Sequence, residues 1–158
     1  MSVIGIRTRS YRVGEHSRRG WPGSVSRPLR ILVPYTTEDH TRAALNAAAA
    51  MARDLRAEVI LVALQVVPYP LPLDRPHVHV EFTVRRLRNL VMNSSLSARV
   101  ELVFARNKSD ALKTLIDPAS LVLLTTEDHW WRTAEERLTR TLIKQGCNVS
   151  LLTLPLNM

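Results

Sequence analysis

The sequence predicts an α/β domain in which a five-stranded parallel sheet lies between four helices. Short runs rich in leucine and β-branched residues recur five times from about Leu29, and longer segments with apolar residues at helical spacing separate them. Four of the five glycines fall before this alternation begins. Strands that alternate with helices are joined by right-handed crossovers, which give a mostly parallel sheet covered on both faces.

The first half of the alternation contains two strands and one helix. Leu29–Tyr35 is a short apolar run typical of a buried strand, and Glu58–Val67 is a second run, rich in β-branched residues. Between them, Thr41–Arg56 carries alanines on one helical stripe, which permits close packing against a sheet. The proline-rich stretch Pro68–Pro76 cannot continue the second strand, so it is expected to form a loop.

The second half repeats the pattern with three helices and three strands. Apolar residues at helical spacing predict the helices, and Gly146 stands where a helix C-terminal glycine belongs. The expected helices are Val78–Asn93, Ser109–Ile116 and Trp130–Gln145, and the expected strands are Ala98–Ala105, Ser120–Leu124 and Asn148–Leu154.

Residues 1–28 differ from the rest of the chain in composition. They hold six arginines and one glutamate, so they contribute +5 to the formal net charge of +8, and they hold four of the five glycines. Such a segment is expected to be a flexible basic arm that folding does not need, with residues 29–158 forming the domain. A solvated tail, a transit peptide and a misassigned start are all open explanations of the arm.

The composition also limits the classes of function. The single cysteine, Cys147, excludes an internal disulfide framework. No apolar run approaches the roughly 20 residues that cross a bilayer, so a cytoplasmic protein without a membrane partner is expected. Most of the positive charge lies in the arm, and no nucleic-acid motif accompanies Arg85, Arg86 and Arg88. A solvated helix face is therefore favoured over a specific nucleic-acid site.

Three segments together resemble the universal stress proteins. Ile31–Tyr35 followed by Thr41–Leu45 is similar to the family's opening strand and helix start, Ser120–Leu124 to its fourth strand, and Gly146–Leu152 to its closing segment. The fold of this UspA-like family is Rossmann-like and related to the adenine nucleotide alpha hydrolases. The resemblance implies a parallel sheet of order 3-2-1-4-5, counted along the chain, a role in the stress response and pairing of two copies.

The positions that bind ATP in that family are changed in this chain. Thr36 stands where ATP-binding members have an aspartate, and the loop after the fourth strand, Thr125–Trp131, has no glycine. Glycine-rich loops hold phosphates because bare backbone N–H groups approach them closely at a helix N-terminus. The place of the family's Gly-Ser pair holds Glu135 and Glu136, whose charges repel phosphate. We therefore expect no bound ATP and no other cofactor.

One pentapeptide occurs twice. Thr-Thr-Glu-Asp-His fills residues 36–40 after the first strand and residues 125–129 after the fourth. In the expected strand order these two strands are neighbours, so the two strings would lie side by side at the usual ligand crevice. Helix capping explains both strings and is favoured, and a divalent-metal or small-ligand site is the alternative. The candidate metal ligands are Glu38, Asp39, His40, Glu127, Asp128 and His129.

The last strand is the expected dimer contact. It would be an edge of the sheet, and it is apolar, without the charges that usually protect an edge. The contact residues would be Val149, Leu151, Leu152, Thr153 and Leu154.

No catalytic triad, nucleophile elbow or acid–base pair is recognisable, so no enzymatic activity is expected. The leading hypothesis is a non-enzymatic regulatory or interaction module that forms a homodimer and meets an unidentified protein partner. The alternative is a small-ligand or divalent-metal sensor that uses the paired Thr-Thr-Glu-Asp-His strings.

Overall fold

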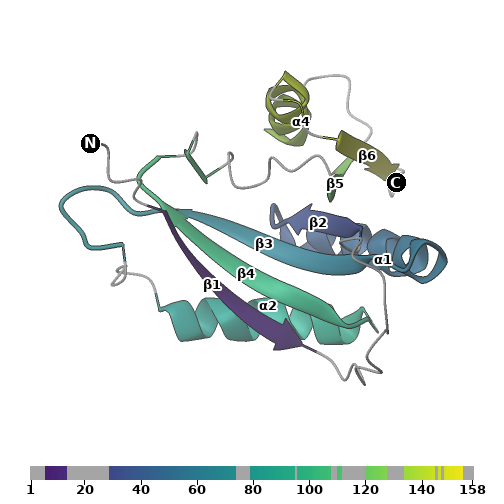
Figure 1. Ribbon diagram of the computed structural model, residues 1–158, viewed down its shortest axis with the longest axis horizontal. Helices are drawn as coiled ribbons and strands as arrows, with labels where there is room; N and C mark the ends of the chain where they lie inside the picture. Colours follow the sequence, from purple (N-terminus) through teal and green to yellow (C-terminus); the bar gives the residue numbers. More distant parts are fainter. Residues whose placement is uncertain are drawn as a thin grey trace, which may run out of the picture.

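The described part of the chain folds around one sheet of six strands (Figure 1). The computed structural model describes residues 6–13, 29–73, 79–94, 96–107, 110–111, 120–127, 134–144, 146 and 148–154. The strands are β1 (Ile6–Val13), β2 (Arg30–Pro34), β3 (Glu58–Val66), β4 (Ala98–Ala105), β5 (Ser120–Glu127) and β6 (Asn148–Leu154). The helices are α1 (Glu38–Leu55), α2 (Val80–Asn93) and α4 (Ala134–Lys144).

The five strands that the sequence predicts are parallel and lie in the predicted order. The sheet runs β1-β4-β3-β2-β5-β6, so that β4-β3-β2-β5-β6 corresponds to the order 3-2-1-4-5. The α/β fold class is therefore confirmed, with β1 as an additional strand. Three of the four expected helices are present in the described part of the chain. Of the fourth, Ser109–Ile116, only Asp110 and Ala111 are described, and both are helical.

The N-terminal strand β1 corrects the sequence analysis. The flexible arm expected over residues 1–28 is wrong for residues 6–13, which pair antiparallel with β4 along its whole length. Period-two alternation puts Arg9 and Tyr11 on the same face of the strand, and Tyr11 packs against the hydrophobic core. The composition of the whole arm conceals this short strand, whose backbone groups on one side pair with the edge of β4. The other residues before Leu29 lie outside the described part.

Each face of the sheet carries its own hydrophobic core. On one face, alternate strand residues such as Ile31, Leu61 and Leu102 pack with residues of α1 and α2. On the other face, Leu32 and Val122 pack with Leu142 of α4. The two clusters place α4 on the face opposite α1 and α2, and Figure 1 shows α4 beside β5 and β6. The two-sided covering explains why the parallel strands are apolar at consecutive positions rather than at alternate ones.

The described helices do not include a candidate for spanning a membrane, since none of them is both long and apolar enough.

Candidate functional site

The switch point of the sheet lies between β2 and β5. The chain proceeds from β2 outward to β3 and β4, and then returns to the other side of β2 to form β5. Because β2 and β5 are parallel neighbours, their carboxyl ends lie side by side at the same end of the strands. In open α/β sheets, this is where ligands bind. The two Thr-Thr-Glu-Asp-His strings follow or complete these two strands.

The first string forms the start of α1. Thr37 is the N-cap residue, and its side-chain hydroxyl accepts a hydrogen bond of 3.3 Å from the backbone N–H of His40. Glu38 and Asp39 occupy the first turn, where negative charge is stabilised by the helix dipole. The capping interpretation is therefore confirmed for this string. The helix begins at Glu38 rather than at the predicted Thr41. Because Thr37 is the N-cap, residues 38–40 form the first turn of the helix.

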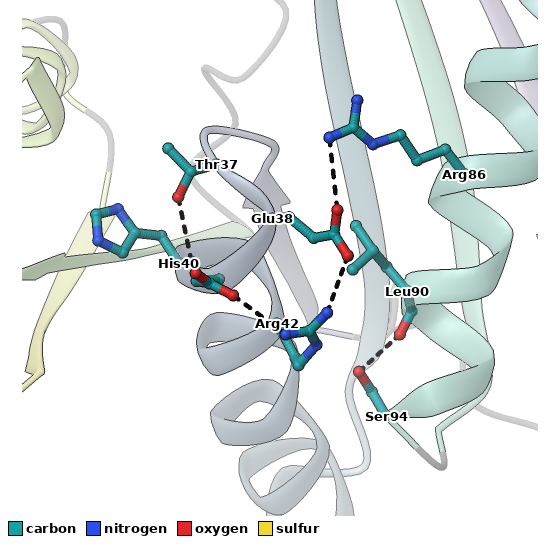
Figure 2. Close-up of polar contacts among 8 residues, drawn as sticks. Thr37, Glu38, His40, Arg42, Arg86, Leu90 and Ser94 are labelled. Atoms are coloured by element: carbon teal, nitrogen blue, oxygen red, sulfur yellow. Dashed lines mark hydrogen bonds and ion pairs between the residues drawn. The ribbon is translucent and has the colours of Figure 1, made fainter. Parts of the chain in front are cut away.

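Two arginines meet the carboxylates of this first turn (Figure 2). Arg42 contacts Glu38 at 2.9 Å and Asp39 at 3.2 Å, and Arg86 of α2 contacts the other Glu38 oxygen at 3.5 Å. These side chains are largely exposed, so each ion pair contributes at most about 0.5 kcal/mol. The ion pairs turn both carboxylates toward cations of the protein itself.

The second string is joined to the first. The hydroxyl of Thr125 in β5 donates a hydrogen bond of 2.6 Å to the backbone carbonyl of His40. The predicted proximity of the two strings is thereby confirmed for their described residues. A second threonine bond lies beside it, in which the N–H of Thr36 donates to the hydroxyl of Thr41 at 3.2 Å. Thr41 is only 1% exposed, so this polar contact is internal to the fold.

The second string is not the loop that the sequence analysis expected. Residues 125–127 continue β5 to Glu127, and the register pairs them with residues 152–154 of β6. Pairing with β6 satisfies the backbone of these residues, which extends the strand three residues beyond the predicted Leu124. Asp128 and His129 lie outside the described residues.

The metal hypothesis can therefore be compared with only part of its ligand set. Glu38, Asp39 and His40 come from consecutive positions on one helix turn, and Glu127 ends β5. Within the described ranges, no group of three or more histidine, cysteine, aspartate or glutamate side chains could hold a metal ion.

The positions at which this chain differs from ATP-binding members of the family that it resembles lie at the same end of the strands. Thr36 stands between β2 and α1, and its backbone N–H is used in the bond to Thr41. Glu135 and Glu136 are the second and third residues of α4. The segment 128–133 that precedes this helix lies outside the described residues.

Arg106 is a residue that sequence reasoning missed. It directly follows β4, and its guanidinium group donates hydrogen bonds to the carbonyl oxygens of Val67 and Leu71 in the loop after β3. The same group lies 4.1 Å from the centroid of the Tyr69 ring. Arg106 thus fixes the described start of the proline-rich loop at the carboxyl ends of β3 and β4. The available signal was an arginine directly after a strand, facing a loop whose prolines cannot donate backbone hydrogen bonds.

The expected dimer contact occupies β6, at the end of the sheet opposite β1. Val149 is half-buried and packs against the core on the α4 face. Leu151, Leu152, Thr153 and Leu154 pair with residues 124–127 of β5 through the backbone. The predicted strand bounds and the predicted edge position are both confirmed.

Comparison with solved structures identifies the fold. A universal stress protein from Archaeoglobus fulgidus is similar with a TM-score of 0.52 and 13% sequence identity, over 79% of this chain and 92% of that one. The chain has the universal stress protein fold. A second universal stress protein, solved in complex with cAMP, gives a TM-score of 0.51 and 16% identity, over 82% of this chain and 98% of that one. No protein-family profile and no curated protein sequence matches the chain.

Proposed function

We propose that this chain is a non-enzymatic regulatory or interaction module of the universal stress protein type. It acts in the cytoplasm without ATP, as a homodimer paired through β6, and takes part in the stress response by binding another protein. The fold supports the general class. The proposal that the protein acts without ATP rests on the polar groups at the switch point, where a universal stress protein would hold its nucleotide.

The observation that carries this proposal is the internal use of those polar groups. Thr37 caps α1, Glu38 and Asp39 pair with Arg42, and Thr125 bonds to the carbonyl of His40. A nucleotide phosphate approaching this helix start would have to compete with the Thr37 cap and with the carboxylates that already hold the arginines. Threonine at position 36 also lacks the carboxylate that ATP-binding members of the family carry at that place.

Isothermal titration calorimetry with ATP, ADP and cAMP tests the proposal. We expect no saturable binding at submillimolar nucleotide, with at most weak heats that disappear as salt screens the net positive charge. A one-to-one isotherm that persists at physiological ionic strength would overturn the ATP-independent module. Cyclic AMP belongs in the test because one universal stress protein of similar fold was solved with it.

A ligand or metal sensor is the second candidate, favoured by the contact between Thr125 and His40 that brings the two strings together. Titration with Mn²⁺ and Zn²⁺, followed by the melting temperature, distinguishes it from the first proposal. In a sensor, the double variant Glu38→Gln/Asp39→Asn would abolish a metal-induced rise in melting temperature, and Glu81→Gln on α2 would leave the rise unchanged. The module proposed first predicts no such rise in the unaltered chain.

A further inference from the structure

The sheet ends on one side at β1, and α2 packs against this end of it (Figure 1). Thr8, Arg9 and Ser10 in the middle of β1 are exposed. Within the described residues, no strand pairs with the outer side of β1. A strand in this position presents a row of backbone N–H and C=O groups to the solvent, which is a template for one more strand.

Positive charge surrounds this edge. The sequence of β1, IRTRSYRV, contains three arginines and no acidic residue. Helix α2 adds Arg85 and Arg88 against a single acidic residue, Glu81, whereas its third arginine, Arg86, pairs with Glu38 of α1. The two elements meet directly, since the guanidinium group of Arg88 lies 5.6 Å from the centroid of the Tyr11 ring. A strand added to β1 would therefore lie beside arginines from both elements.

The aromatic rings at this end of the molecule hold the arginines in place. Besides Arg88 over Tyr11, Arg9 lies 5.9 Å from the ring centroid of Phe104 in β4. An arginine that already rests on a ring loses less side-chain entropy when it meets a carboxylate. The surface is thus partly ordered for a negatively charged ligand before the ligand arrives.

Two other occupants fit this surface less well. A second copy paired through β1 would bring arginines of both copies together, and like charges across a strand pair are destabilising. Single-stranded nucleic acid binds by stacking bases on open aromatic rings, whereas Tyr11 lies beneath Arg88 and Phe104 is fully buried. Exposed Phe82 and Met92 on α2 are residue types enriched in contacts between proteins.

We infer that the outer edge of β1 binds an extended acidic segment of a partner protein as an added strand. Backbone hydrogen bonds to β1 provide affinity, and alternate carboxylates on the α2 side meet Arg88 and Arg85, which gives specificity. This inference rests on the proposed interaction function because it names the class of partner. The inference concerns β1, whereas dimerisation is proposed at β6, on the opposite edge of the sheet. Either one can therefore be disproved while the other holds.

A fluorescently labelled peptide in which glutamate alternates with leucine tests this inference in the full chain. Binding is followed by fluorescence anisotropy at physiological ionic strength. We expect Arg85→Glu/Arg88→Glu to weaken binding by about tenfold or more, because two attractive charge contacts become repulsive. The matched control is Arg137→Glu/Arg140→Glu, which makes the same charge change at the same spacing on exposed positions of α4, on the other side of the sheet.

A second probe tests strand addition separately from charge. The same peptide with all its backbone nitrogens methylated keeps its carboxylates but cannot donate hydrogen bonds to a strand edge, so we expect it not to bind the unaltered chain. This measurement needs no variant and stands even if Arg85→Glu/Arg88→Glu disturbs folding, in which case Arg85→Gln/Arg88→Gln replaces that variant.

Three results would overturn the inference. Absence of peptide binding, or equal weakening by the α2 and α4 variants, would show that no specific acidic-segment site exists on this face. Equal binding of the methylated peptide would exclude strand addition. Tight binding of a single-stranded oligonucleotide that only the α2 variant abolishes, together with no peptide binding, would assign the surface to nucleic acid instead.

Discussion

The two edges of the sheet are built in opposite ways. At one edge, β1 runs antiparallel to β4, contains three arginines in eight residues and is anchored to the core by Tyr11. At the other edge, β6 runs parallel to β5, and its seven residues, NVSLLTL, carry no charge. Charged residues are a common means of keeping an edge strand from pairing with another copy. The difference favours self-association through β6 and a partner of opposite charge at β1.

Deleting residues 1–13 is the change at the two edges from which we expect the largest effect. The deletion removes β1, exposes the edge of β4 and takes Tyr11 away from the core. We expect a loss of stability on the order of 3 kcal/mol, which corresponds to a fall in melting temperature of roughly 10 °C. Differential scanning calorimetry measures it, and deletion of residues 1–5, which precede β1, is the control. An unchanged melting temperature would mean that folding does not need this segment, as the composition suggested.

A lysine in β6 tests the other edge. We expect Leu152→Lys to convert a dimer at tens of micromolar, about the range of modest affinities, into a monomer, because it places a charge on an otherwise uncharged edge. Multi-angle light scattering gives the mass. Ser10→Lys adds the same charge to the exposed edge of β1 and should leave the dimer intact. If the unaltered chain is already a monomer at that concentration, β6 is not the contact.

The anchoring of β1 is tested by one aromatic residue. Tyr11→Ala removes a ring that packs against the core and supports Arg88, and we expect it to lower the free energy of unfolding by about 2 kcal/mol, less than for a fully buried aromatic residue. The matched control is Tyr69→Ala, whose ring is 76% exposed and also contacts an arginine. Urea denaturation of the two variants compares them directly. Equal losses would mean that Tyr11 does not anchor the strand.

The sequence predicted the parallel part of the fold because burial on both faces leaves a strong signal. Runs such as Ile31–Val33 and Val59–Val62 are apolar at every position, and packing requires them to be. In β1, by contrast, one anchored residue, Tyr11, is surrounded by arginine, serine and threonine. Its strand state depends on the edge of β4, more than 80 residues away in sequence, and composition alone cannot reveal a partner at that separation.

The location of the candidate site was predictable from the sequence, but its hydrogen bonds were not. The repeated pentapeptide and the strand order together placed the two strings next to each other. The specific link, from the hydroxyl of Thr125 to the carbonyl of His40, depends on how far β5 extends along β6, and the apolar run that predicts this strand ends at Leu124. Arg106 shows the same limit, because its partners Val67 and Leu71 are backbone carbonyls, which every residue has.

The smallest predicted effect concerns this link, which joins the β6 side of the sheet to α1. The strands β2 and β5 pair along residues 30–32 and 120–122, and the bond from Thr125 to His40 adds a polar contact between β5 and α1. Thr125→Val keeps the side-chain shape and removes the donor. We expect a loss of about 1 kcal/mol, the usual net contribution of one hydrogen bond, in urea denaturation.

Thr141→Val is the matched control for that variant. Its hydroxyl also donates to a backbone carbonyl, that of Arg137 at 3.0 Å, but this bond is exposed and lies within α4. Water can replace such a bond, so the control should change the free energy of unfolding by no more than about 0.5 kcal/mol. If both variants lose the same amount, the contact between the two strings adds nothing specific, and β5 and β6 are held to the rest of the sheet by strand pairing and apolar packing alone.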